Sequence, residues 1–277
     1  MSGGARTMTL LPGRLSAFLR RDLREALTYK FSFVSSFVGI LLSSATFYFV
    51  AKLVPPGTPS LGPFGGDYFS FAVVGVAFSS LLGMFQEGLP AVVRGAQVSG
   101  TLEALLVTPA SIPTVLFGSS LYSLVFQIFR TVLHVGVAVA FFGMTLGRVN
   151  VAGALSVGVL TILCFLGVGI LSASFILVYK TGNPFGWVLG TVSGLFGGVV
   201  FPVALLPPWI RWISSLLPVT YALDGMRKCL LASAGFAEVL PDIVALAVFN
   251  IVLLPLSLLA FRLAVRKAKR DGTLSHF

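Results

Sequence analysis

Charged residues are scarce in this sequence. Only 10% of its 277 residues are charged, and nine of them are acidic. Soluble domains usually have about 25% charged residues, so this composition excludes an ordinary soluble domain. Hydrophobic residues make up 56% of the chain instead, and the mean hydropathy is +0.98. The composition therefore predicts an integral membrane protein.

Motifs that bind nucleotides or catalyse hydrolysis are missing as well. The sequence has no Gly-x-x-x-x-Gly-Lys-Ser/Thr loop for phosphates, no His-Glu-x-x-His and no nucleophile elbow. Its acids are scattered, and its two cysteines, Cys164 and Cys229, have no metal-ligand spacing. We therefore expect the chain itself to hold no catalytic residue, cofactor or metal. A membrane enzyme, which would need clustered His, Asp or Glu, is disfavoured.

Long hydrophobic runs predict the fold. A helix needs about 20 apolar residues to cross the hydrocarbon, and six windows are long enough. They are Phe31 to Leu53, Tyr68 to Leu89, Val115 to Phe142, Val151 to Val178, Phe185 to Leu206 and Ile243 to Phe261. The runs are continuous and do not alternate, which favours helices over barrel strands. We expect an all-α membrane protein whose six transmembrane helices form one domain, residues 31–262.

Basic residues indicate how the chain is oriented. The net charge is +10, but Lys and Arg cluster beside hydrophobic spans, which is typical of membrane topology and contact with membrane lipids, not of nucleic-acid binding. One side collects thirteen of the 19 basic residues, from the two ends of the chain, Arg94 and Lys180. The other side collects five, and Arg130 lies within a span. This asymmetry predicts that both termini, including the basic tail of residues 263–277, are cytoplasmic.

Residues 1–30 have a basic amphipathic pattern. Apolar residues recur at helical spacing between Leu15 and Leu27, and basic residues occupy the other side. This pattern favours a helix that lies in the plane of the membrane interface. The alternative is a solvated start to the first span.

One segment between the second and third spans differs from the rest. It is Gly100-Thr101-Leu102-Glu103-Ala104-Leu105-Leu106-Val107-Thr108-Pro109. Three leucines form one face and the acid stands off it, while Ser99 or Thr101 is suited to cap the start and Pro109 limits the end. A short helix at the cytoplasmic surface, residues 97–109, would present this pattern to a soluble partner. A plain interfacial connector would have similar leucines.

Two spans carry residues that need an explanation. Gln127, Arg130 and His134 lie close to one face of the third span, where ionisable groups are costly and need a partner. They either contact substrate or satisfy one another in an interhelical hydrogen bond. In the fifth span Gly186, Gly190, Gly194 and Gly198 are spaced by four and are expected to share one face. Such a face allows close packing within the chain, against a second subunit, or along a closed pathway.

The stretch 206–236 is expected to form two short helices in the outer interface. Its first part, Pro207 to Pro218, is amphipathic and too short to span the membrane. A second helix is expected from Val219 to Ala234, separated from the first by Pro218. Trp and Tyr are frequent here, as they are at membrane interfaces. We expect a re-entrant pair of half-helices before the last span.

Two motifs together resemble the permease subunits of ABC exporters with the ABC transmembrane type-2 domain, also called the type V exporter fold. Arg94 followed by the segment 100–109 resembles that family's cytoplasmic loop between spans two and three. The string from Phe201-Pro202 to Leu217-Pro218-Val219-Thr220-Tyr221-Ala222-Leu223-Asp224-Gly225-Met226-Arg227 is similar to its outer re-entrant region. The number of spans, their orientation and the amphipathic start also match.

The resemblance implies a complex of two permease subunits, identical or closely related, with two ATPase subunits that are encoded separately and bind ATP and Mg. It implies an ATPase-coupling helix at Arg94, Gly100, Thr101, Leu102, Glu103, Leu105, Leu106, Thr108 and Pro109. It implies an external gate at Pro202, Pro207, Trp209, Pro218, Tyr221, Asp224 and Arg227. The glycines of span five would face the path or the second permease, and the complex would lie in the inner membrane of a prokaryote.

The transported substrate is less well indicated. The string Pro218 to Arg227 is more similar to the branch of the family that exports drugs and lipids than to the capsule branch, so we expect an amphipathic, drug-like or lipid-like substrate. Export of a polysaccharide or glycolipid is the alternative. A proton-coupled secondary transporter would need no ATPase, but it predicts a carboxylate relay within the spans, and the span interiors contain no acid.

Overall fold

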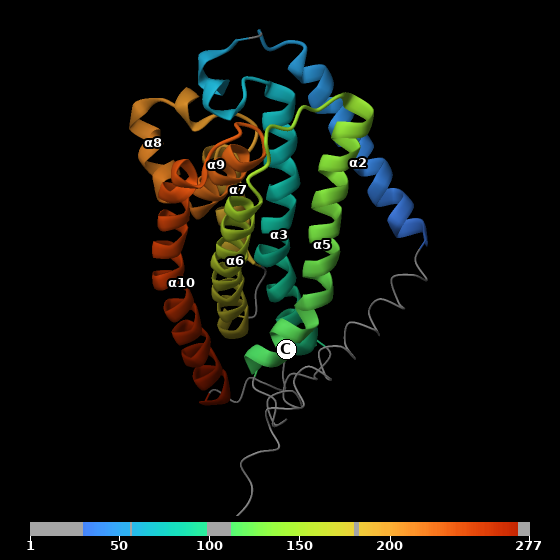
Figure 1. The fold of residues 1–277 in the computed structure, drawn as a ribbon. Coiled ribbons are helices and arrows are strands. Elements are labelled where there is room, and N and C mark those ends of the chain that lie inside the picture. The colour runs from blue at the N-terminus through green and yellow to red at the C-terminus, as the bar shows by residue number, and fades with distance from the viewer. Residues whose placement is uncertain (1–29, 56, 99–111, 180–182, 271–277) are drawn as a thin grey trace, which may run out of the picture.

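The computed structural model describes residues 30–55, 57–98, 112–179 and 183–270, with only the backbone for residues 30–33, 112–120, 122 and 269. Within these residues the regular structure is entirely helical (Figure 1). Five helices are long and apolar enough to cross a membrane. They are α2 (Lys30–Ala51), α3 (Tyr68–Val98), α5 (Ile112–Phe142), α6 (Val151–Tyr179) and α10 (Phe236–Arg270). The chain is thus an all-α, multi-pass membrane protein, as its composition predicts.

The expected fifth span is much shorter than its hydrophobic window. The window ran from Phe185 to Leu206, but helix α7 covers only Pro184–Phe196, which is 13 residues. The helix ends because Gly197 and Gly198 follow, and Gly198 has a φ of +77°, a left-handed conformation that an L side chain rarely adopts. Beyond this point the backbone is irregular as far as the short 3₁₀ helix η2 (Val203–Leu205). The prediction of six full-length spans is therefore corrected: among the described residues five helices are long enough to span, and the short helix α7 stands where the fifth span was expected.

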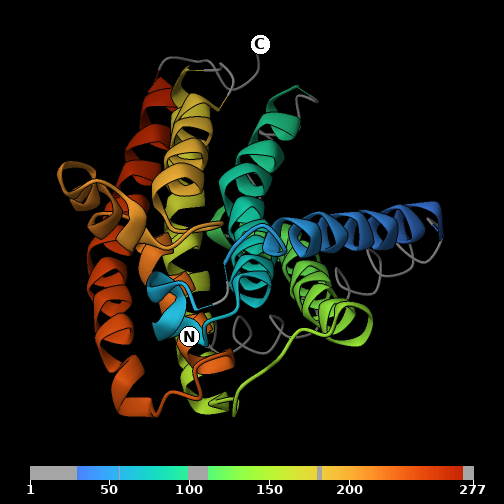
Figure 2. The same ribbon diagram turned by 90° about the horizontal axis from the view of Figure 1, so that it is seen from above.

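Helices α3, α6 and α10 form the centre of the bundle. Helix α6 packs against both α3 and α10, whereas α5 packs on α3 from the other side. Helix α2 packs on α3 and α5, and it leans away from the other long helices (Figure 2). The core of the bundle is therefore built by three of the five long helices.

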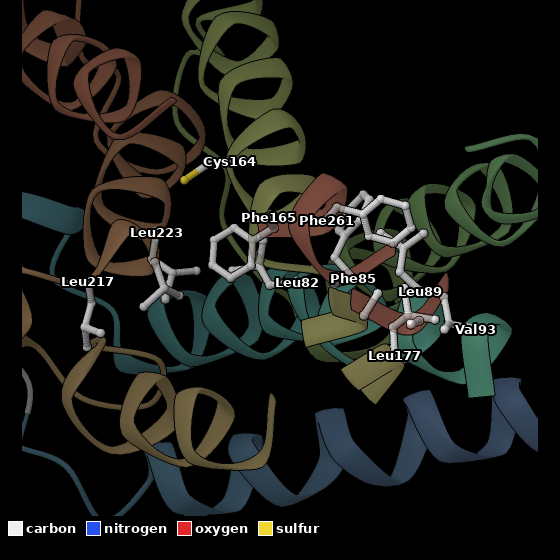
Figure 3. Close-up of a cluster of buried hydrophobic side chains, with 14 residues drawn as sticks. Leu82, Phe85, Leu89, Val93, Cys164, Phe165, Leu177, Leu217, Leu223 and Phe261 are labelled. Carbon is white, nitrogen blue, oxygen red and sulfur yellow. The ribbon is translucent and has the colours of Figure 1, made fainter. Parts of the chain in front are cut away.

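A cluster of buried apolar side chains joins these three helices. Phe85 and Leu89 of α3, Phe165 of α6 and Phe261 of α10 are each less than 7% exposed, and they lie together in this cluster (Figure 3). Close packing is possible because Gly169 lets α6 approach α3, where an added Cβ would lie 2.5 Å from the carbonyl oxygen of Phe85. Small residues at helix contacts serve this purpose in membranes, since lipid tails supply no hydrophobic drive between helices.

Several short helices gather at one end of the bundle. The 3₁₀ helix η1 (Pro59–Phe64) follows α2, and helices α8 (Pro208–Ser215) and α9 (Pro218–Leu230) precede α10. All three lie at the end of the molecule opposite the end of α10 at Arg270 (Figure 1). The two helices expected between residues 206 and 236 are thus present as α8 and α9, while their place in the outer membrane interface stays a prediction.

Candidate functional site: the outer junction

Helix α9 inserts into the bundle between α3, α6 and α10. Leu217 precedes it and Pro218 occupies its first turn, a position where the missing proline N–H costs nothing. Its apolar side chains, Val219, Leu223 and Met226, are buried. This amphipathic face fixes the rotation of the helix, and it directs the side chain one residue beyond Met226 into the protein.

Arg227 is that side chain, and none of it is exposed. Its guanidinium donates hydrogen bonds to three backbone carbonyls: Nε to Phe71 at 3.2 Å, Nη1 to Gly198 at 2.8 Å and Nη2 to Val199 at 2.7 Å. Its Cζ atom also lies 3.4 Å from the centre of the Phe71 ring, in a cation–π contact. We call Arg227 and these three carbonyls the outer junction, because they join α9, α3 and the loop after α7 on the side that the sequence predicts to face outward.

A glycine in α3 makes room for this junction. A Cβ added at Gly75 would lie 1.9 Å from the carbonyl oxygen of Val199 and 2.3 Å from Nη2 of Arg227. Neither distance is physically possible, so only glycine allows the loop and the guanidinium to approach α3. The break after α7 serves the same end, because Gly198 and Val199 leave the helix and turn their carbonyls toward Arg227.

The charge of Arg227 is balanced mainly by dipoles. Burial lowers the pKa of Arg227 to about 9, and Asp224 one turn away opposes that shift. The side chain therefore stays protonated at neutral pH. Burial raises the pKa of Asp224 from 3.8 to about 6, with Arg227 acting in the other direction. Lys228, which follows Arg227 on α9, forms an ion pair with a side chain of α10: its Nζ donates to Asp242 at 2.7 Å.

The predicted gate residues do not all meet. Pro218, Tyr221, Asp224 and Arg227 share helix α9, where the hydroxyl of Tyr221 donates to the carbonyl of Ser215 at 3.0 Å. Pro202 is buried at the start of η2. Pro207 and Trp209 lie at the start of α8 and are exposed, Trp209 by 73%. Trp209 thus points away from the outer junction, which suits a side chain at a membrane interface.

The polar residues of the third span, Gln127, Arg130 and His134, all lie on α5. Thr131, which lies between Arg130 and His134, donates to the carbonyl of Ala77 in α3 at 3.3 Å. His134 is buried, Gln127 and Arg130 are half-buried, and Nε2 of His134 has no hydrogen-bond partner among the described residues. In the part of the chain that the structure describes, none of these three residues forms an ion pair with a carboxylate.

The four glycines of the fifth span do not share one helix face. Gly186, Gly190 and Gly194 lie in α7, but Gly198 lies beyond its end and belongs to the outer junction. Gly186 packs against α3, since an added Cβ would meet the carbonyl oxygen of Gln86 at 2.8 Å. Gly194 has nothing within 4 Å of an added Cβ. Close packing inside the chain therefore explains Gly186 but not Gly194.

The predicted coupling residues are mostly outside the described residues. Arg94 lies in the last part of α3 and is exposed. The residues from Gly100 to Pro109 fall in the stretch 99–111, and the amphipathic pattern of residues 1–29 lies outside the description too. The coupling helix and the interfacial helix therefore stay predictions.

Several residues of the outer junction carried no clear signal in the sequence. Gly75 is one of 30 glycines, and nothing nearby distinguishes it. The partners of Arg227 are backbone carbonyls, which no side-chain pattern reveals. One signal was available: a basic residue on the apolar side of the short amphipathic helix that begins at Pro218.

Comparison with known families gives one match. The sequence profile described as ABC-2 type transporter matches residues 14–231, more than three quarters of the chain. No curated protein matches the chain. The matched region contains helices α2 to α9 and ends just after the outer junction.

Proposed function

This chain belongs to the ABC-2 type transporter family, and from that premise we propose that it is the permease subunit of an exporter driven by a separate ATPase. Members of this family are membrane permeases that usually work with an ATPase partner. The permease forms the translocation path, and ATP and Mg bind to the partner. We further propose that it lies in the cytoplasmic membrane of a prokaryote, with both termini in the cytoplasm.

The proposal rests mainly on one observation: helix α3 runs without a break from the outer junction to the predicted coupling segment. At one end, Phe71 and Gly75 of α3 hold Arg227 and the loop after α7. At the other end, α3 terminates at Val98, directly before the predicted coupling segment. Between these ends its buried side chains pack on α6 and α10. One continuous helix of 31 residues thus links the expected ATPase contact to the outer junction, so a tilt imposed at Val98 would reach Arg227.

A second permease subunit is part of the proposal. Trp187, Val188 and Leu195 of α7 are more than half exposed, and Gly194 on the same helix faces open space in this chain. A 13-residue helix is too short to cross the hydrocarbon alone. We propose that α7 packs against a second copy, or a close relative, and that the substrate passes between the two.

The substrate is proposed to be amphipathic, drug-like or lipid-like. The path beside α7 would be lined by Phe, Trp, Leu and Gly, which suit apolar groups and offer few hydrogen bonds to a polysaccharide. Thr131, which lies between Arg130 and His134, would then hold α5 to α3 through its bond to the carbonyl of Ala77.

Co-purification with the partner ATPase tests the proposal. The permease would be co-expressed with the ATPase encoded beside it, purified through a tag on the permease, and assayed for ATP hydrolysis. Glu103→Lys is expected to weaken association or to abolish stimulated hydrolysis while leaving membrane insertion intact. The matched control is Glu238→Lys, which reverses an exposed acid at the other end of the bundle. Equal binding and equal stimulated hydrolysis in the two variants would refute the coupling role.

A further inference from the structure

A pocket of about 230 Å³ lies between α3, α6 and α7, far from the outer junction. Its lining includes Glu87, Pro90 and Arg94 of α3, Ile176 of α6, and Asn183 and Trp187 at the start of α7. Pro90 is about 20 Å along α3 from Gly75, toward the side that we expect to be cytoplasmic. Sites that enclose a drug-sized ligand have about 300–1,000 Å³. This pocket therefore suits a headgroup rather than a whole amphiphile.

Asn183 fixes one wall of the pocket by replacing a backbone donor that Pro90 lacks. Pro90 has no N–H, so the carbonyl of Gln86 lacks the hydrogen bond that a helix would supply from four residues on. Nδ2 of Asn183 donates to that carbonyl instead, at 2.7 Å. Oδ1 of Asn183 accepts from the backbone N–H of Gly186 at 2.9 Å and so starts α7. One side chain thus satisfies α3, begins α7 and sets the distance between them.

The pocket presents one charge of each sign. Glu87 and Arg94 are seven residues apart on α3, so they share a face and are separated by about 10 Å along the axis. Both are exposed, and neither forms an ion pair among the described residues. Trp187, which is 72% exposed, adds an indole to the same pocket. A carboxylate, a guanidinium and an indole around one cavity are suited to a ligand that carries both an ammonium and a phosphate.

We propose that this pocket binds the zwitterionic headgroup of a phospholipid-like substrate. The ammonium lies against Glu87 and the indole of Trp187, and the phosphate lies against the guanidinium of Arg94. The acyl chains remain outside, next to the exposed apolar residues Phe185 and Val188 of α7. This inference rests on the proposed function, because it names the substrate class of the export path that α3 and α7 would line.

Fluorescence of Trp187 tests the proposal directly. The chain has three tryptophans, and Trp209→Phe with Trp212→Phe leaves Trp187 as the single indole. The full chain, purified in a non-ionic detergent, is titrated with dihexanoyl phosphatidylcholine, dihexanoyl phosphatidylglycerol and free phosphocholine. We expect a saturable change with the choline lipid, weaker binding of the glycerol lipid that lacks an ammonium, and the weakest binding of free phosphocholine. Equal affinity for free phosphocholine would overturn the lipid as the source of the headgroup.

Variants separate the two charges. Glu87→Gln should lower the affinity for the choline lipid by about tenfold and leave the affinity for the glycerol lipid unchanged. Arg94→Gln should lower the affinity for both lipids by a similar factor, because both lipids carry the phosphate. Arg148→Gln, an exposed arginine at the opposite end of the bundle, is the matched control and should change neither. Unchanged affinities in both pocket variants would overturn the proposal, since a non-specific detergent-like contact does not depend on these charges.

The test is independent of the ATPase. Headgroup binding is measured on the permease alone, whereas the proposed function is tested by association with the ATPase and by stimulated hydrolysis. Normal coupling to the ATPase together with charge-independent lipid binding would refute the headgroup site and leave the proposed export function standing. Charge-dependent binding without any ATPase association would refute the exporter and leave the pocket.

Discussion

Arg227 contacts Phe71 in two ways at once. Its Nε donates to the Phe71 carbonyl at 3.2 Å, and its Cζ lies 3.4 Å from the centre of the Phe71 ring. A buried charge is costly unless its hydrogen bonds are satisfied, and here carbonyl dipoles from two separate segments do this. Arg227 therefore fixes α9 to α3 more specifically than apolar packing would.

Replacing this arginine should loosen the end of the bundle where α9 packs on α3. Arg227→Lys keeps the charge but offers one ammonium in place of a planar fork, so it cannot reach Phe71, Gly198 and Val199 together. We expect a loss of at least about 2 kcal/mol in the free energy of unfolding, seen as a lower thermal midpoint in detergent.

Arg211→Lys is the matched control for this substitution. Arg211 also donates to two carbonyls, of Leu206 at 2.8 Å and Ala204 at 2.6 Å, but it is exposed. Its replacement should change stability by less than about 0.5 kcal/mol. Equal midpoints for the two variants would show that burial of Arg227 contributes nothing.

The second prediction concerns Gly75. Gly75→Ala should destabilise the protein by about 3 kcal/mol or more, since its Cβ would overlap the Val199 carbonyl and the Arg227 guanidinium. Gly83→Ala, in the same helix, meets nothing within 4 Å and should be neutral or stabilising by up to about 1 kcal/mol. Thermal midpoints of the two variants measure the contrast. A harmless Gly75→Ala would mean that the loop after α7 does not rest on α3.

The third prediction joins Asn183 to Pro90. Asn183→Asp still accepts from the Gly186 N–H but cannot donate to the Gln86 carbonyl, so we expect a loss of about 1–3 kcal/mol. Pro90→Ala returns a backbone N–H to that carbonyl, and the Asp substitution should then cost much less. A double-mutant cycle on thermal midpoints gives the coupling. Additive effects would mean that Asn183 does not compensate for the proline.

The fourth prediction is a pH dependence that comes from Asp224. Its pKa is raised to about 6 in the folded protein, so the folded state holds the proton more tightly than the unfolded state, whose value is 3.8. The stability that this group contributes is complete below pH 4 and is lost as the pH rises through 6. Asp224→Asn should therefore gain in thermal midpoint over the parent between pH 4.5 and pH 7.5. A constant difference across that range would contradict the raised pKa.

The fifth prediction tests the interface at α7. Gly194→Leu should lower the yield of the permease dimer without unfolding the single chain, because none of the described residues lies within 4 Å of an added Cβ. Gly136→Leu on α5 is the matched control, since Gly136 also meets nothing within that distance. Cross-linking and size-exclusion chromatography in detergent report the dimer. Equal dimer yields would place the second subunit elsewhere.

Much of the fold followed from hydrophobic runs alone. The continuous apolar windows predicted α2, α3, α5, α6 and α10. A helix of about 20 apolar residues matches the thickness of the membrane hydrocarbon and is stable there. The window for α7 was too long because hydropathy reports side-chain polarity and not the backbone conformation that ends a helix. Val199 and Val200 are as apolar as the helix before them, yet Gly197 and Gly198 end it.

The candidate site was predicted less completely. The string Pro218 to Arg227 marked the correct helix, since its proline, its acid and its apolar face are visible in the sequence. The partners of Arg227 and Asn183 are carbonyls, and every residue has one, so no pattern distinguishes Phe71, Val199 or Gln86. Tertiary packing selects them. Only the proline at position 90, which leaves a carbonyl without its donor, gave a reason to look for a polar partner nearby.

The short length of α7 has a consequence for hydrogen bonding in the bilayer. Thirteen residues span about 20 Å, whereas the hydrocarbon is about 30 Å thick. Irregular backbone such as residues 197–202 is tolerated at membrane depth only inside protein or beside water. Gly197 and Gly198 are buried inside the protein, and the carbonyls of Gly198 and Val199 accept from Arg227. The guanidinium of Arg227 thus supplies to these carbonyls the donors that the hydrocarbon lacks.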